Sequence, residues 1–196
     1  MLVRLRQEVQ EVPRGLRPPA TPLSDGVVRL EPLGDRNIAD FERLTADPDV
    51  IRYTRVPEHR ADGFAATWVE TYMRAWDDGS RAGYAIDDVS DGSFLGMAAL
   101  VRIQLDMAEA EVGYIVAPEA RGRGVAVRAV RLLSHWAFED VGLSRLEAWI
   151  DPANEPSVRV AERVGFMFEG MRRSVHVKHG VRADMAVYSL LPGELT

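Results

Sequence analysis

The chain has 196 residues, of which 46% are hydrophobic and 28% charged, and its formal net charge is -6. This length favours one globular domain, the acidic balance argues against a broad nucleic-acid-binding face, and the absence of cysteine excludes disulfides and cysteine-ligated metals. The sequence shows neither an apolar run of about 18 residues nor a secretory leader, so we expect no membrane contact and a cytoplasmic location.

The first 25 residues differ from the rest of the chain. Four prolines between positions 13 and 22 remove backbone donors that a helix or a central strand would need. We therefore predict a proline-rich N-terminal arm at 1–25, followed by one domain at 26–196.

Turn residues and apolar periodicity predict the elements of the first half of the domain. They are a strand at 27–30, a helix from Asp35 or Asn37 to about Leu44, a helix from 61 to about 76, and strands at 84–86 and 94–103 with a turn at Asp91-Gly92.

The second half begins with a strand at 110–116, which Pro118 ends. There follow a helix from Ala126 to about Gly142, a strand at 146–150, a helix capped by Asn154 and ending at Gly165, and strands at about 166–177 and 184–190 around a turn at Gly180. Strands mixed with helices in this way predict an α/β layer fold.

The segment 116–126 joins a predicted strand to a predicted helix through two glycines. Gly122 and Gly124 allow the backbone to approach a ligand closely and to adopt dihedral angles that other residues avoid. The free N–H groups of the helix start attract an anion, and Arg121 and Arg123 add positive charge. The loop therefore suits a pyrophosphate, while a basic loop that only caps a helix is the alternative.

Two other phosphate-binding motifs do not fit this loop. A Walker A loop needs a lysine and then Ser or Thr after its second glycine, and neither follows Gly124. A dinucleotide-binding fingerprint needs a third glycine three residues later, where Val127 stands.

Arg121-x-x-Gly124-x-Ala126 resembles the Arg/Gln-x-x-Gly-x-Gly/Ala motif with which the GNAT acyltransferases hold the pyrophosphate of acetyl-CoA. Further segments, in the expected order, are similar to the RimJ/RimL branch of that family. They are Glu111-Val112-Gly113-Tyr114, Asn154-Glu155-Pro156-Ser157 and Glu162-Arg163-Val164-Gly165-Phe166. The resemblance covers about residues 26–191, with Arg128 near a position where the branch often has glutamate.

The resemblance implies an α/β fold of the GNAT type, with a mixed, mostly antiparallel central sheet flanked by helices on both faces. It also implies a homodimer and an N-acyltransferase that takes acetyl-CoA as its donor and uses no metal. The acceptor would be an amine, either a protein N-terminal α-amine or a small molecule. The expected donor-binding residues are Val116, Arg121, Gly122, Arg123, Gly124, Val125, Ala126 and Asn154.

The absence of cysteine bears on mechanism, because no cysteinyl acyl intermediate can form. We expect the amine to attack the thioester directly in a ternary complex, with a backbone N–H near Val116 stabilising the oxyanion. Glu111 is the candidate base, acting directly or through water, and a structural salt bridge is its alternative role. Ser157 is the candidate hydrogen-bond donor to the departing sulfur, although Asn154 and Ser157 also suit a helix N-terminus.

Several alternatives stay open from the sequence. The donor could be another acyl-CoA such as succinyl-CoA, and a non-catalytic acyl-CoA-binding module is a second class of function. Trp68, Tyr72 and Trp76 share one helix face at i, i+4 and i+8, a spacing more typical of a core than of a pocket. An electronegative opening opposite the thiol would favour a cationic amine.

Overall fold

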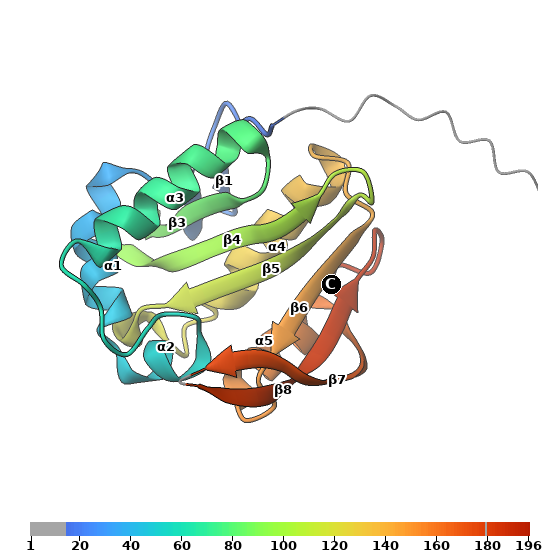
Figure 1. Cartoon of the computed structure of the whole chain (residues 1–196). Helices are drawn as coiled ribbons and strands as arrows, with labels where there is room; N and C mark the ends of the chain where they lie inside the picture. Colours follow the sequence, from blue (N-terminus) through green and yellow to red (C-terminus); the bar gives the residue numbers. More distant parts are fainter. Residues whose placement is uncertain (1–14, 179) are drawn as a thin grey trace, which may run out of the picture.

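The computed structural model describes residues 15–178 and 180–196, and these fold around one eight-stranded sheet (Figure 1). The strands are β1 (Leu23–Ser24), β2 (Val28–Pro32), β3 (Ala82–Asp88), β4 (Phe94–Gln104), β5 (Glu109–Val116), β6 (Arg145–Ile150), β7 (Met167–Lys178) and β8 (Val181–Leu190). Their order in the sheet is β1-β2-β3-β4-β5-β6-β8-β7. Every neighbouring pair is antiparallel except β5 and β6, which are parallel.

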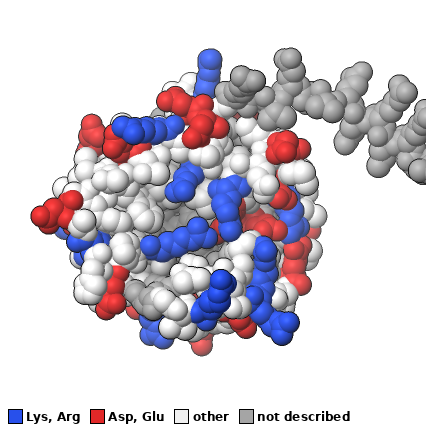
Figure 2. All heavy atoms as spheres, in the orientation of Figure 1, with Lys and Arg blue, Asp and Glu red and all other residues white. Residues whose placement is uncertain are grey.

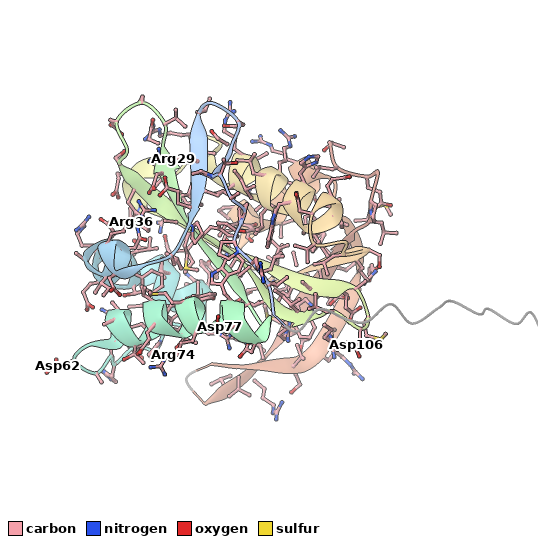
Figure 3. All side chains as sticks on the ribbon, turned by 90° about the horizontal axis from the view of Figure 1, so that it is seen from above. Arg29, Arg36, Asp62, Arg74, Asp77 and Asp106 are labelled. Carbon is pink, nitrogen blue, oxygen red and sulfur yellow. The ribbon has the colours of Figure 1, made fainter. Side chains whose placement is uncertain are left out.

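Helices cover both faces of this sheet. They are the short turns η1 (Asp35–Asn37) and η2 (Pro118–Ala120) and the helices α1 (Ile38–Thr45), α2 (Pro48–Tyr53), α3 (Phe64–Asp78), α4 (Val125–Glu139) and α5 (Glu155–Val164). α3 packs on β3 and α1 packs on α3, whereas α4 packs on β2, β4 and β5 and α5 packs on α4. Figure 3 shows α3, with Arg74 and Asp77, on one side of the sheet and α4 on the other. The predicted fold class is confirmed.

The predicted elements are present, with small shifts at their ends. α4 ends at Glu139, three residues before Gly142, and Asn37 uses its Oδ1 to accept from the N–H of Gly34 (3.2 Å) rather than to cap α1. The sequence prediction missed α2. This helix has two recognisable start signals, because Asp47 caps it by accepting from the N–H groups of Asp49 and Val50, and Pro48 occupies its first position.

The pairing of β5 with β6 is short, and this opens the middle of the sheet. Only Glu109–Glu111 pair with Arg145–Glu147. Beyond them β5 continues to Val116 beside β4 alone, and β6 continues to Ile150 beside β8 alone. The two strands spread apart in Figure 1, so the sheet consists of two halves that meet at three residue pairs.

The core lies between the helices and both halves of the sheet, and Leu146 of β6 and Leu190 of β8 belong to it. Trp76 of α3, Tyr84 of β3 and Trp136 of α4 form a cluster of three rings with centroids 5.6 to 6.0 Å apart. Helix α3 approaches β3 so closely that a Cβ at Gly83 would stand 2.5 Å from the ring of Tyr72, and the glycine makes this approach possible. The cluster and this close approach hold α3 against the sheet.

The predicted N-terminal arm falls partly outside the described residues, since the structure describes the chain from residue 15. Leu16 donates its N–H to the carbonyl of Trp76 (2.9 Å) and packs against the core. β1 pairs with β2 at the edge of the sheet. The division between arm and domain at residue 25 stays a prediction.

Among the described residues, no helix combines the length and the apolar character that crossing a bilayer requires.

A charged network ties the strands of the second half together. Arg145 of β6 makes a bidentate contact with Glu169 of β7, at 3.0 and 2.5 Å, and also contacts Glu147. Ser189 of β8 donates to Glu169 at 2.7 Å. The hydrogen bond from Arg145, followed by that from Ser189, lowers the pKa of Glu169 to about 2 from an ordinary value of 4.5.

This network predicts an acid-sensitive part of the stability. A carboxylate whose pKa is lower in the folded state stabilises the fold above its unfolded pKa, and this contribution is lost as the pH falls through the folded value. The Glu169→Gln variant should therefore be less stable than the parent by about 0.5–1 kcal/mol at pH 7, since the pair is partly exposed. The difference should shrink as the pH falls from about 4.5 towards 2. Urea unfolding at a series of pH values measures it.

Glu70→Gln on α3 is the control, because Glu70 makes one exposed pair with Arg74. A difference between Glu169→Gln and the parent that stayed constant down to the lowest pH would contradict the network.

Candidate active site

Two cavities meet where β5 and β6 diverge. One, of about 450 Å³, is lined by the loop before α4, the start of α4 and one side of α5, and we call it the loop cavity. The other, of about 610 Å³, contains Arg52, Arg55, Arg81 and Arg102 in its lining, and we call it the arginine cavity. Both are lined by Tyr53, Thr54, Tyr114, Ile115, Asn154 and Ser157. The two cavities therefore share a boundary between the halves of the sheet.

The free edge of β5 faces this boundary. Ala117 donates its N–H to the carbonyl of Leu95 on the β4 side (2.9 Å), and successive residues of a strand direct their backbone groups to opposite edges. The backbone groups of Val116 and Tyr114 therefore point away from β4, into the gap that β6 has left. The carbonyl of Val116 accepts from Arg121 Nε (3.3 Å) on this side. The N–H of Val116 points into the same gap, and its role as the oxyanion donor stays a prediction.

The loop before α4 has the geometry of an anion cradle. Gly122 and Gly124 have φ of 76° and 77°, in the left-handed region that favours glycine. No side chain caps α4, and the first hydrogen bond within it runs from the N–H of Arg128 to the carbonyl of Gly124 (3.2 Å). The N–H groups of Val125, Ala126 and Val127 therefore have no acceptor within the helix, and these residues line the loop cavity.

The two loop arginines have different surroundings. Arg121 lines the loop cavity and makes ion pairs with Asp47 (2.6 Å) and Asp49 (3.0 Å) at the start of α2. Burial alone would raise the pKa of Asp47, but the hydrogen bonds from Arg121 and from the N–H of Val50 lower it overall. Arg123 contacts Asp88 (3.1 Å) at the end of β3 and is not part of the cavity lining. Of the two, only Arg121 is placed beside the predicted phosphate site.

Further cations near the loop cavity were not predicted. Arg159 and Arg163 of α5 line it opposite the start of α4. They stand four residues apart, so the sequence could have indicated that they share one face of this helix. Arg128, the departure from the branch pattern, makes an ion pair with Asp25 (2.6 Å).

Asn154, Ser157 and Tyr114 form a hydrogen-bonded group at the shared boundary. The Oδ1 of Asn154 accepts from the N–H of Ser157 (3.3 Å), so Asn154 caps α5. This is the helix-capping role that the sequence analysis gave as its alternative. The hydroxyl groups of Ser157 and Tyr114 lie 2.8 Å apart. Burial raises the pKa of Tyr114 to about 12, so its hydroxyl stays protonated at neutral pH. The sequence analysis assigned no role to Tyr114.

Glu111 lies on the other face of β5. Side chains alternate along a strand, so Glu111 points to the side opposite Tyr114, and the two residues are about 10 Å apart along the strand. Glu111 lines the arginine cavity and makes an ion pair with Arg102, which stabilises its ionised form. The structure therefore places both members of the predicted catalytic pair in the lining of the arginine cavity, Glu111 from β5 and Ser157 from the first turn of α5.

Arg102 owes its position to an irregularity in β4. It has φ of 50°, and the β4–β5 register shifts between Val101 and Gln104. Bulges of this kind redirect side chains and occur often beside functional sites. The Arg102 guanidinium lies 3.7 Å from the ring centroid of Trp149, and that of Arg172 lies 4.2 Å from it. Sequence reasoning missed Arg102, because a positive φ at arginine has no sequence signal. It also missed Trp149, the ring on which Arg102 lies.

The aromatic stripe of α3 serves two purposes. Trp76 belongs to the core, as its spacing predicted, while Trp68 and Tyr72 also line the arginine cavity.

No group of three or more metal-ligating side chains is found among the residues that the structure describes.

Comparison with known proteins places this site in a family. Residues 28–167 match the model of the acetyltransferase (GNAT) domain. A Bacillus subtilis protein named "Putative ribosomal N-acetyltransferase YdaF" is 35% identical over 136 residues, covering 68% of this chain and 72% of the relative. The spermidine N(1)-acetyltransferase of Escherichia coli is 27% identical over 143 residues, covering 73% and 74%.

Solved structures agree. Mycobacterium smegmatis RimJ in complex with CoA-disulfide superposes with a TM-score of 0.78 at 26% identity, covering 89% of this chain and 88% of that one. Vibrio cholerae spermidine N-acetyltransferase in complex with CoA and spermine has a TM-score of 0.76 at 19% identity, with coverage of 87% and 98%, which supports the fold.

The loop geometry predicts that CoA stabilises the protein through the start of α4. At about 100 times its dissociation constant, CoA should add about 2.7 kcal/mol to the free energy of unfolding. Arg121→Ala combined with Gly124→Asp should abolish this gain, because the new carboxylate competes for the N–H groups and repels phosphate. Thermal unfolding with and without CoA measures the effect.

Arg123→Ala is the matched control, since Arg123 lies in the same loop but outside the cavity lining. It should retain most of the stabilisation. Unchanged affinity for CoA in the double variant would overturn the assignment of the loop.

Proposed function

This chain belongs to the GNAT acetyltransferase family and is an acyl-CoA-dependent N-acetyltransferase, and we propose that it acetylates the α-amine of a protein N-terminus by direct transfer. The observation that carries the proposal is the meeting of two cavities at the gap between β5 and β6. Donor and acceptor can enter from opposite faces of the sheet and meet in that gap. A relative at 35% identity is named a ribosomal N-acetyltransferase, which supports a protein acceptor.

The loop cavity holds acetyl-CoA in this proposal. The N–H groups of Val125 and Ala126, together with the backbone of Gly122 and Gly124, receive the pyrophosphate. Arg121 adds positive charge there and anchors the loop to α2 through Asp47 and Asp49. Arg123 contributes only through its longer-range field, because its side chain contacts Asp88.

The thioester end then lies at the shared boundary. Asn154 uses Oδ1 to cap α5, which leaves its side-chain N–H groups to donate to an amide carbonyl of the donor. The N–H of Val116, on the free edge of β5, donates to the carbonyl oxygen as it gains negative charge.

The reaction needs no covalent enzyme intermediate. The lone pair of the neutral amine attacks the thioester carbon, so a C–N bond forms and the C–S bond breaks. The nitrogen loses one proton to Glu111, directly or through water, and the sulfur leaves with the bonding electron pair and finally takes up one proton. The ion pair with Arg102 keeps Glu111 in the carboxylate form that accepts a proton.

Ser157 and Tyr114 act on the leaving group from the other face. Tyr114, with a pKa of about 12, is a weaker acid than a thiol, whose ordinary pKa is about 8.5. Tyr114 lies within hydrogen-bond distance of both the carbonyl (3.0 Å) and the hydroxyl (2.8 Å) of Ser157, so it orients Ser157 beside the sulfur instead of transferring its own proton. Base and hydrogen-bond donor thus lie on opposite faces of β5, so the amine meets its base on the arginine-cavity side and the departing sulfur meets its hydrogen-bond donor on the α5 side.

A homodimer in the cytoplasm completes the proposal. β7 is the last strand of the sheet and exposes Met167, Phe168 and Met171, which are 45–56% exposed. Apolar side chains on an unpaired edge strand are typical of a surface that a second chain covers.

Light scattering after size exclusion should give twice the 21.8 kDa mass, and Met171→Lys should shift the mass towards the monomer. A monomer at micromolar concentration in the parent would refute this part.

Release of free CoA tests the enzymatic proposal. The protein is incubated with acetyl-CoA and peptides of varied N-terminal sequence, and mass spectrometry locates the added acetyl group. In Glu111→Gln, kcat/KM should fall by roughly 10²–10⁴ because proton removal loses its base, while the dissociation constant for CoA stays unchanged.

Glu109→Gln is the matched control, because Glu109 stands two residues away on the same face of β5 and bonds to Gln104 instead of Arg102. Its activity should equal that of the parent. Acetylation of peptide lysines but not of α-amines would contradict the proposed acceptor, and equal activity of Glu111→Gln would remove Glu111 as the base.

A further inference from the structure

The charge of the arginine cavity is unbalanced. Its lining contains four guanidinium groups, from Arg52, Arg55, Arg81 and Arg102, and two carboxylates, from Glu111 and Asp151. The ion pair with Arg102 occupies Glu111. Figure 2 shows the corresponding gathering of positive side chains around the hollow on this face of the molecule. The cavity therefore carries excess positive charge within a protein whose net charge is -6.

Apart from Arg102, the arginines around the cavity make no ion pair among the described residues. No salt bridge in that part of the chain joins Arg52, Arg55, Arg81 or Arg172 to a carboxylate. Burial, and then the nearby charge of Arg55, lowers the pKa of Arg102, with Arg172 acting in the same direction and Glu147 opposing it. An anion placed among these groups would relieve the repulsion between them.

The aromatic walls make the site suited to recognising such an anion. Arg81 lies with its guanidinium 5.8 Å from the centroid of Tyr72, and Arg102 lies over Trp149. Arg81 also hydrogen-bonds to the Tyr72 side chain, which positions it, while Arg102, stacked on Trp149, keeps its in-plane N–H donors available for an anion. The rings of Trp68, Tyr72 and Trp149 also displace water, which strengthens electrostatic contacts inside the cavity.

We propose that the acceptor of this enzyme carries an anionic group close to its amine, as a protein N-terminus with Asp or Glu among its first residues does, and that Arg55 and Arg81 bind this group. The inference rests on the proposed function and names its substrate class. It disfavours a polyamine, because a chain of ammonium groups would enter a cavity already rich in guanidinium groups. The sequence analysis linked a cationic amine to an electronegative opening, and the opening is electropositive.

A competition among acceptors tests this inference. Three peptides of matched length, beginning Ser-Asp-Glu, Ser-Ala-Ala and Ser-Lys-Lys, are compared with spermidine, with acetyl-CoA at saturation. Free aspartate is a fifth acceptor that separates a small anionic amine from a peptide. The acidic peptide should show the highest kcat/KM, by about tenfold or more over the basic peptide at low salt, and the difference should shrink as salt increases.

The variants Arg55→Glu and Arg81→Gln locate the preference. Arg55→Glu should lower the ratio of acidic to basic peptide by about tenfold or more through KM for the peptide, and leave KM for acetyl-CoA unchanged. Arg74→Gln on the outer side of α3 is the control, since Arg74 contacts Glu70 and lies outside both cavities (Figure 3). It should leave every ratio unchanged.

The outcomes distinguish a failure of the proposed function from a failure of the anionic acceptor alone. If no acceptor releases CoA although acetyl-CoA binds, the proposed function fails. If acceptors react but the basic peptide or spermidine reacts best, or if Arg55→Glu leaves the ratio unchanged, only the anionic acceptor is overturned. A preference for free aspartate over every peptide would support the anionic group and overturn the peptide.

Discussion

The interruption of backbone pairing between β5 and β6 is the constraint on which the site depends. Three residue pairs join the halves of the sheet, and beyond them the edge of β5 faces an opening instead of a strand. Unpaired backbone donors in a protein interior need a partner, and here the partner can be a ligand. The same divergence lets two cavities meet through the sheet, so the gap both binds the donor and admits the acceptor.

Much of the fold could be predicted from the sequence, because its signals are local. Turn residues and periodicity predicted the strands and the long helices. The cap at Asn154 and the glycines of the loop are signals that also lie within a few residues of one another. Helix α2 was missed although Asp47-Pro48 begins it, since six residues offer too little periodicity to recognise. Its position matters, because its start contacts Arg121 and its end borders both cavities.

The arginine cavity could not be predicted in the same way. Arg55, Arg81 and Arg102 come from segments far apart in the chain, and only the packing of α2 and α3 over the sheet brings them together. Arg102 also depends on a positive φ, which propensity does not predict for arginine. Likewise Arg121 and Arg123 look equivalent in the loop sequence, and their different ion pairs follow from where Asp47, Asp49 and Asp88 lie.

The choice of arginine over lysine in this cavity has a chemical consequence. The sequence contains 24 basic residues, and Lys178 is its only lysine. A lysine side chain beside an activated thioester is itself a nucleophile whenever it loses its proton, whereas a guanidinium stays protonated in proteins and does not react. The described lining of the arginine cavity includes no lysine. The enzyme can therefore hold an anion next to its acetyl donor with cationic groups that do not become acetylated themselves, so the donor is kept for the incoming amine.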